Sequence, residues 1–473
     1  MKKLITVILM LALLLVLLSG CRDTGCDCIT HFFSGSHQSG AIIANSESPI
    51  IVDNKILTFD LKEFPETNYE NSDDFLSYTG KITAEYSLHN PSDTTVNEKV
   101  FFYIGEEASY ADFNNADANK YDVLIDGSSV EKKIRHTLSI NNEELNLEKS
   151  LDLISDSFVE DDFYSPELNA TKYTFRINGV DTKKYDTACI AFDVPKGLGS
   201  NRIYLPNRHV VNSQKDDFVR INMFINNNRQ AFELYVFGTP LSVLPEWKVY
   251  KDTDAEDKDI ISGKVSLVST ESLTFKDFAL ENWSTESGVS EVDWYNATVT
   301  EINKNSSYNP DYPIVDLYLY EMAFVDQLDR WYEYDIAIES GERIKNTVIT
   351  PAYPYIDTRY DSNIYEYTYL TSSSKSWKSF GETEIIINTP YYLFISSYDD
   401  FVKSESGYTL KLNNIPDEEL KIEMSAVEDP WESLFTETFP WADVTVCVLF
   451  VLLIGFVIFV FVKRKKKNRS EPA

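Results

Sequence analysis

Cysteine is scarce in this chain of 473 residues, which contains only five. Cys21 follows an apolar run near the amino terminus, and Cys447 lies in a second apolar run, where it has the expected role of a small apolar residue. That leaves Cys26, Cys28 and Cys189, an odd number, and Cys26 and Cys28 are too close in sequence for a relaxed disulfide. We therefore expect no disulfide framework, so that a hydrophobic core must hold the domains together.

Recognisable catalytic motifs are also absent. The chain has no Gly-x-Ser-x-Gly, no His-Glu-x-x-His and no phosphate-binding loop. Of its histidines, only His89, His136 and His209 fall in the expected folded region. We therefore expect a non-enzymatic protein without a cofactor and assign no catalytic residue. The alternative is an exported hydrolase that acts on glycans or peptides, because the abundant carboxylates could include a glycosidase pair.

Basic residues are too few to balance the acidic ones. The chain has 43 Lys and Arg against 75 Asp and Glu, which gives a formal net charge of −32. Such a charge repels nucleic acid, so no nucleic-acid partner is expected. The expected partners are the membrane and an extracellular protein or glycan, and the acidic surface itself is interpreted mainly as a solubilising one.

A long apolar run lies near the carboxy terminus. Val444 to Val462 contains no charged residue, and Lys463 to Lys467 follows directly. A helix of this length rises about 28 Å, enough to cross a bilayer, and the basic cluster marks the cytoplasmic side. The sequence thus predicts a single-pass plasma-membrane protein with an outside ectodomain and a cytoplasmic tail, 463–473. Residues 429–443 form the linker before the span, in which Trp441 fits the membrane interface.

The amino terminus predicts export. Lys2 and Lys3 precede the apolar run from Leu4 to Leu18, which has the length of a signal-peptide core. Leu18-Ser19-Gly20-Cys21 resembles the lipobox of bacterial lipoproteins, a likeness that implies a diacylglyceryl group on the Cys21 thiol. The alternatives are an ordinary signal peptide or an uncleaved anchor. Residues 1–20 are thus the expected signal peptide, and residues 21–45 the expected flexible tether.

Strand patterns dominate the expected ectodomain. Residues 81–89 alternate apolar and polar side chains, which is typical of a strand with one buried face. Aromatic residues make up 14% of the chain, enough to build a large core. The expected fold is mainly β: two or three β-sandwich-like units, a minor helical insertion and one carboxy-terminal transmembrane helix. The expected units are residues 46–150, 151–270 and 271–428.

One helix is predicted within the third unit, at residues 290–304. Ser290 and Asp293 have the spacing of a capping box. Apolar residues then recur on one face at helical spacing, namely Val292, Tyr295, Val299 and Ile302. We therefore expect a helix with one apolar face.

Residues 84–93, Ala-Glu-Tyr-Ser-Leu-His-Asn-Pro-Ser-Asp, are followed by an aromatic strand and an Ile-Asp-Gly hairpin. This region resembles the first β-sandwich domain of a group of exported, membrane-anchored bacterial proteins that carry one carboxy-terminal span with a basic tail. The resemblance covers residues 46–150 best. It implies a β-sandwich fold and transfers no catalytic residue, because the matching motifs are turns and strands.

Two clusters have the residue types of metal ligands. Asp252, Asp254, Asp257 and Asp259 present alternating carboxylates that calcium favours, but the EF-hand glycine and its final glutamate are missing. Cys26, Cys28, His31 and His37 lack usual zinc spacing. We therefore interpret both as solvated segments and expect no metal site. Alternating aromatics in Trp331-Tyr332-Glu333-Tyr334 could stack on sugars, but we expect them to be core residues.

Overall fold

The computed structural model describes most of the expected ectodomain. Strands account for 51% of it and helices for 11%, so the chain is mainly β, as predicted. The predicted signal peptide, Cys21, most of the linker, the span at 444–462 and the basic tail lie outside the described residues. Within the described ranges, no helix has the length and apolar character needed to cross a membrane. Those ranges are 32–33, 37–64, 80–106, 121–139, 147–161, 163–195, 201–206, 209–214, 218–225, 231–252, 254–306, 314–315, 317, 324, 327–413 and 418–431.

The largest sheet combines strands from both halves of the chain. Its order is β25-β26-β23-β4-β5-β20-β7-β8, with β23 parallel to β4. β5 is the strand predicted from alternation, and its apolar side chains do point to one buried face. The bounds are β4 (Ile51–Leu61), β5 (Gly80–His89), β7 (Asp122–Ile125), β8 (Ser128–Ser129), β20 (Arg343–Ala352), β23 (Phe380–Asn388), β25 (Val402–Ser404) and β26 (Gly407–Leu412).

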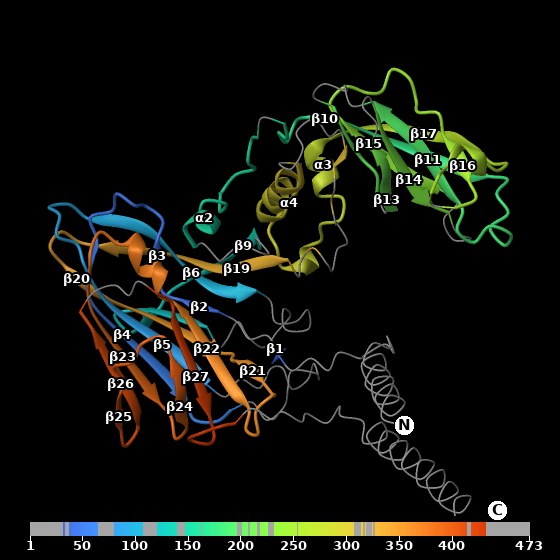
Figure 1. The fold of residues 1–473 in the computed structure, drawn as a ribbon. Helices are drawn as coiled ribbons and strands as arrows, with labels where there is room; N and C mark the ends of the chain where they lie inside the picture. Colours follow the sequence, from blue (N-terminus) through green and yellow to red (C-terminus); the bar gives the residue numbers. More distant parts are fainter. Residues whose placement is uncertain are drawn as a thin grey trace, which may run out of the picture.

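Two smaller sheets pack on the same face of this large sheet and complete a first sandwich (Figure 1). One has the order β1-β21-β22-β27-β24, with β2 also paired to β22; the other is β3-β6-β19-β9. Their bounds are β1 (Phe32–Phe33), β2 (Gln38–Ser39), β3 (Ile42–Ile43), β6 (Val96–Glu106), β9 (Lys133–Leu138), β19 (Leu328–Ile338), β21 (Tyr355–Asp357), β22 (Ile364–Leu370), β24 (Tyr392–Ser396) and β27 (Leu420–Ser425).

The first sandwich therefore joins parts of two expected units. Strands from the expected unit 46–150 share sheets with strands from the expected unit 271–428, as in the pairs β6 with β19 and β5 with β20. Sequence patterns show each strand but not its distant partner. The boundaries expected at residues 150 and 270 stay predictions.

Residues 37–43 are part of the core, and the expectation of a flexible tether up to residue 45 is wrong for them. β2 pairs with β22, whereas β3 pairs with β6, so this short segment bridges the two smaller sheets. Ser39, Ala41 and Ile43 are all buried. Gly40 is required here, because a Cβ at this position would lie 2.2 Å from the Tyr86 hydroxyl. We call residues 37–43 the strap.

A second sandwich is inserted between β9 and β19 in the sequence. Its two sheets have the orders β17-β10-β15-β12-β18 and β13-β14-β11-β16, and they enclose their own apolar core. Figure 1 shows it in green, apart from the blue and orange first sandwich. The bounds are β10 (Asn169–Asn178), β11 (Cys189–Pro195), β12 (Arg202–Tyr204), β13 (His209–Gln214), β14 (Phe218–Phe224), β15 (Ala231–Phe237), β16 (Lys248–Tyr250), β17 (Lys264–Thr274) and β18 (Ile314–Val315).

Helices lie between the two sandwiches. α3 (Phe275–Ala279) and α4 (Glu291–Ser306) share a core with Tyr235 and Phe237 of β15 and with Leu138 of β9. A further short helix, α2 (Leu147–Leu151), covers the outer face of the sheet that contains β6. The predicted helix at 290–304 is confirmed as α4. However, Trp294, Ala297 and Thr298 are buried as well, because α4 has protein on more than one side.

Candidate functional site

Among the described residues, the densest group of buried charges lies where the first sandwich meets α4. The guanidinium of Arg135 lies 3.0 Å from the Asp293 carboxylate, 2.5 Å from that of Glu333 and 3.1 Å from that of Asp156. Lys99 Nζ lies 2.7 Å from Asp156 and 3.0 Å from Glu333. We call these five residues the ionic junction. Two cations face three carboxylates, and Arg135, Asp293 and Glu333 are buried.

Hydrogen bonds favour the ionised forms of Glu333, Asp156 and Arg135. Burial opposes the charge on Glu333, but the hydrogen bonds from Arg135 and Lys99 outweigh it, so the pKa of Glu333 is lowered. The hydrogen bond from Lys99 lowers the pKa of Asp156. Burial likewise opposes the charge on Arg135, yet its bonds to Asp293 and Glu333 raise its pKa. Since buried charges are tolerated only when paired and hydrogen-bonded, the ionic junction is a structural joint.

Local structure explains how these residues meet. Arg135 lies opposite Trp331 in the pairing of β9 with β19, and Glu333 is the diagonal neighbour, within reach of a long side chain. Asp293 lies in the first turn of α4, and its backbone N–H donates a hydrogen bond to the Ser290 hydroxyl at 3.0 Å. This confirms Ser290 as the cap. The Asp293 carboxylate, however, turns to β9 instead of completing a capping box.

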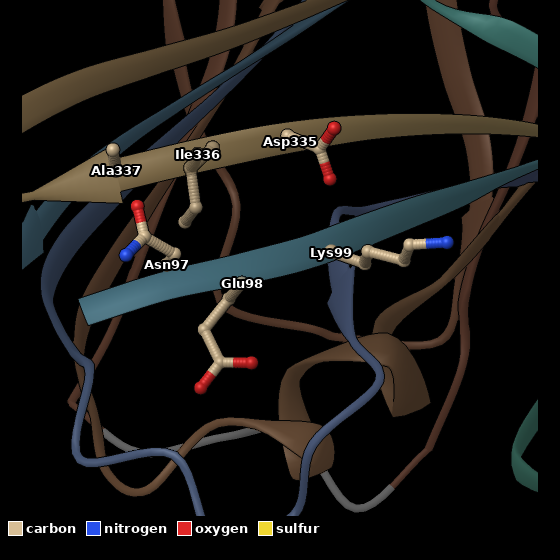
Figure 2. Close-up of a pocket in the computed structure, with 6 residues that line it drawn as sticks. All are labelled: Asn97, Glu98, Lys99, Asp335, Ile336 and Ala337. Atoms are coloured by element: carbon tan, nitrogen blue, oxygen red, sulfur yellow. The ribbon is translucent and has the colours of Figure 1, made fainter.

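A shallow depression adjoins the ionic junction on the outer face of β6 and β19 (Figure 2). It measures about 390 Å³ and is lined by residues 97–99 and 335–337. Lys99 lies opposite Asp335 in the strand pairing, so both occupy one face of the sheet. Figure 2 shows the Glu98 side chain directed away from the Asn97 side chain. The depression is open to solvent, so it offers a polar contact surface rather than a water-excluding pocket.

His136 lies beside this joint but is not suited to acid–base chemistry. It is buried, and burial, together with Arg330 and Arg135, lowers its pKa to about 3. The imidazole therefore stays neutral at ordinary pH, far from the pKa near 7 that suits a general base. His89 lies at the surface, with Nδ1 3.9 Å from the Asp53 carboxylate.

Two carboxylates that share a lysine and a tyrosine lie on the helix-facing side of the second sandwich. The Tyr235 hydroxyl lies 2.6 Å from Glu281 and 3.1 Å from Glu233. Lys172 Nζ contacts the same carboxylates at 2.6 Å and 3.0 Å. One lysine and one tyrosine thus bridge two partly exposed acids. Lys172 offsets their charge, so the arrangement is typical of a surface ion cluster.

The predicted acidic cluster forms a loop after β16. Lys251 enters this loop and contacts Asp259 at 2.8 Å and Asp252 at 3.9 Å. Asp252 also accepts a hydrogen bond from the backbone of Asp254, and Asp257 begins a short 3-10 helix, η2 (Asp257–Asp259). Among the described side chains, no three His, Cys, Asp or Glu are placed to hold a metal ion. The absence of calcium binding stays a prediction.

The remaining sequence candidates divide between core and undescribed positions. Trp331, Tyr332 and Tyr334 are buried, which confirms them as core residues rather than a sugar platform. Cys189 is free and buried, and His37 packs against Tyr355. The expected lipidation site Cys21 and the residues Cys26, Cys28 and His31 lie outside the described part of the chain.

Sequence reasoning missed Lys55, a buried lysine in the first sandwich. Its Nζ lies 4.4 Å from the ring centre of Tyr369 and 5.2 Å from that of Tyr86. Burial lowers the pKa of Lys55 to about 7, although Glu419 opposes this shift. The sequence did contain a signal for its burial, because Lys55 stands two and four residues before Leu57 and Phe59, on the same buried face of β4. Arg135 and Asp293 left no such signal, because they are 158 residues apart.

No protein-family model matches this chain, and no curated protein matches it. Among solved structures, a crystal structure from Legionella pneumophila with the description "putative nutrient binding protein" matches over 83% of this chain and 72% of its own length. The TM-score is 0.31 and the sequence identity is 8%. A likeness at this level carries no argument about the fold or the function of this chain.

Proposed function

We propose that this chain is a non-enzymatic protein of the bacterial cell surface. It spans the plasma membrane once at residues 444–462, keeps its carboxy terminus in the cytoplasm and displays its two sandwiches outside. There it binds an extracellular protein or glycan, in adhesion, envelope organisation or ligand sensing. The export and membrane signals in the sequence support the location.

The ionic junction is the observation that carries the non-enzymatic proposal. It places the densest buried charges of the described residues in a joint between the first sandwich and α4, and the pKa shifts of Arg135 and Glu333 favour their charged forms. Catalytic groups instead need a pKa tuned toward the working pH and access to a substrate. A fixed joint holds the inserted sandwich in place, as a display scaffold requires.

Binding without turnover can be tested with the full chain in nanodiscs. Purified peptidoglycan and denatured protein are the two probes, and co-sedimentation measures binding while released reducing ends and new amino termini measure hydrolysis. We expect no release from either probe. Sustained release of reducing ends or new amino termini would contradict the non-enzymatic proposal.

The hydrolase alternative has one specific observation in its favour, the pair Glu233 and Glu281 bridged by Tyr235. Paired carboxylates are the working groups of most glycosidases. If release is seen, Glu281→Gln and Glu233→Gln should each abolish it, with Glu286→Gln on the nearby exposed turn as the control.

Topology and lipidation are tested separately in intact spheroplasts. An added protease should digest the ectodomain and spare a tag at Ala473. A palmitate analogue should label the wild-type chain and fail to label Cys21→Ser. Loss of the tag with sealed membranes would contradict the topology, and equal labelling of both chains would move the lipid to another cysteine, with Cys447 tested first.

A further inference from the structure

The two ends of the described ectodomain converge on one short segment, residues 357–361. The first strand, β1, pairs Phe32 with Asp357. At the other end, the Trp431 backbone N–H donates to the Asp361 carboxylate at 3.1 Å, and the Asp361 N–H donates to the Trp431 carbonyl at 3.1 Å. Four residues span at most about 14 Å of chain. The two ends of the described ectodomain therefore lie side by side.

Strand register places this convergence at one end of the first sandwich. Asp357 lies opposite Ile364, next to the pair Tyr365 and Met424. Ser425 of the same strand lies opposite Tyr392, which follows the turn after Asn388. Asn388 in turn lies opposite Gly407, at the tip of the β25–β26 hairpin. We call residues 357–361, 425–431 and 402–407 the terminal rim.

The terminal rim exposes large apolar side chains. Val402 is 67% exposed, Trp431 62% and Val427 40%. Arg359, between the two chain ends, is paired with Asp357 at 2.7 Å, so their charges offset each other. Tryptophan is favoured where an apolar membrane interior meets water. The exposed Trp431 is therefore compatible with a position close to a bilayer.

Chain length decides what the terminal rim faces. Twelve residues, 432–443, separate Trp431 from the expected span, and ten residues, 22–31, separate Phe32 from the expected lipid on Cys21. A chain of twelve residues reaches at most about 42 Å when fully extended. Both linkers start from the same rim, so both anchors can enter one membrane there.

We propose that the terminal rim faces the bilayer and that the two anchors hold it there at two points. The inference rests on the proposed membrane anchoring and adds the orientation. β4 has 11 residues, or about 36 Å of strand, and its Ile51 end lies beside His89, which pairs with Arg343. That end of the sandwich therefore points away from the membrane.

Energy transfer to lipid measures this orientation in the full chain. A donor dye is placed at Glu405→Cys on the terminal rim or, as the matched control, at Asp93→Cys in the turn after His89; both natural residues are exposed acids. Cys26 and Cys28 are replaced by Ser in both chains. The acceptor is a labelled phospholipid in vesicles of phosphatidylethanolamine and phosphatidylglycerol that carry the full chain.

We expect transfer from position 405 to exceed that from position 93 about threefold or more, because about 36 Å of strand separates the two ends. Equal transfer, or more from position 93, would overturn the proposed orientation. If the chain fails to sediment with membranes, the proposed anchoring itself is wrong. If the chain sediments with membranes but transfer from positions 405 and 93 is equal, the proposed anchoring stands and only the proposed orientation is wrong.

The two-point attachment has its own test. A site for a specific protease is inserted in residues 22–31, in residues 432–443, or in both. Either single cut should leave the ectodomain on the membrane and reduce the transfer from position 405, because one tether permits rotation. Only the double cut should release it. Release by a single cut would show that the other end carries no anchor.

Discussion

The Asp293 carboxylate accepts a hydrogen bond from the backbone N–H of His136 at 3.0 Å. Among the described strands, β9 lies at the edge of its sheet, so a carboxylate can reach this N–H from outside the sheet. The same carboxylate also binds the Arg135 side chain at 3.0 Å. The Asp293 side chain of α4 therefore bonds to the edge of the sheet and also pairs with the buried Arg135 cation. These two contacts explain why α4 docks at this position.

Replacement of Arg135 by alanine should destabilise the protein strongly. The change leaves Asp293 and Glu333 buried without their main cation, and breaking such a group costs about 3–5 kcal/mol. Urea unfolding of the full chain in detergent measures the loss. Lys133→Ala is the control, because Lys133 is 71% exposed and 3.9 Å from Glu333, so about 0.5 kcal/mol or less is expected. Equal losses for both variants would show that the ionic junction is not a stabilising joint.

Stability should fall as the pH drops from 6.5 toward 3, and His136 should account for part of this fall. The pKa of His136 is lowered to about 3 in the folded protein, first by burial. Between these pH values the unfolded chain binds a proton that the folded chain does not, so acid favours unfolding. The stabilisation is complete above about pH 6.5, and about 2–3 kcal/mol is lost by pH 4.5.

His136→Gln tests this contribution. The variant lacks the titrating group, so its stability should decline less than that of the wild type between pH 7.5 and 4.5. The difference between the two slopes isolates His136, since every other titrating group is shared. Parallel slopes in urea unfolding at several pH values would contradict the assignment.

Local pattern was enough to predict individual elements. β5 and α4 appeared at nearly their observed bounds, because alternation and capping are properties of short segments. The Asp126-Gly127 turn also formed as expected, with positive φ at both residues. Such features depend on neighbours in sequence, and no distant partner can change them much.

Long-range contacts were beyond sequence reasoning. The strap reads as a polar linker because Gln38, Ser39 and Gly40 resemble tether residues, yet hydrogen bonds to Tyr86 and Ser373 secure it. The ionic junction likewise required the meeting of β9 with α4. No pattern in a single sequence identifies which of its 75 acids meets which base.

Gly40→Ala should destabilise the first sandwich. The new Cβ would lie 2.2 Å from the Tyr86 hydroxyl, so the strap or the tyrosine must move. Overpacking of this kind costs about 1–3 kcal/mol. Thermal unfolding of the full chain in detergent measures the loss. An unchanged melting temperature for Gly40→Ala would show that the strap is loosely held.

Calcium should not stabilise the protein in a saturable way. Lys251 already lies against Asp252 and Asp259, so a cation would have to displace it. We expect calcium and sodium at matched ionic strength to shift the melting temperature alike, through screening. A site would instead produce a saturable rise by mass action. Such a rise, lost in Asp252→Asn/Asp254→Asn, would establish a calcium site here.

Lys55→Met should stabilise the protein at neutral pH. Burial lowers the pKa of Lys55 to about 7, whereas an ordinary lysine has a value of 10.5. The charged form is therefore penalised in the fold, while methionine fills a similar volume without a charge. The contacts of Lys55 Nζ with the Tyr86 and Tyr369 rings offset part of that penalty. The expected gain in the free energy of unfolding is therefore about 1–4 kcal/mol.

The pH dependence identifies the cause of the gain. From pH 7 to 10.5 the unfolded chain holds a proton on Lys55 that the folded chain releases, so wild-type stability rises with pH. The penalty is complete below about pH 7 and is relieved as the pH approaches 10.5. The advantage of Lys55→Met should thus be smaller at pH 9.5 than at pH 7 in urea unfolding. Lys345→Met, at an exposed lysine that pairs with Glu85, serves as the control. A variant less stable than the wild type at both pH values would show that the aromatic contacts outweigh the cost of burial.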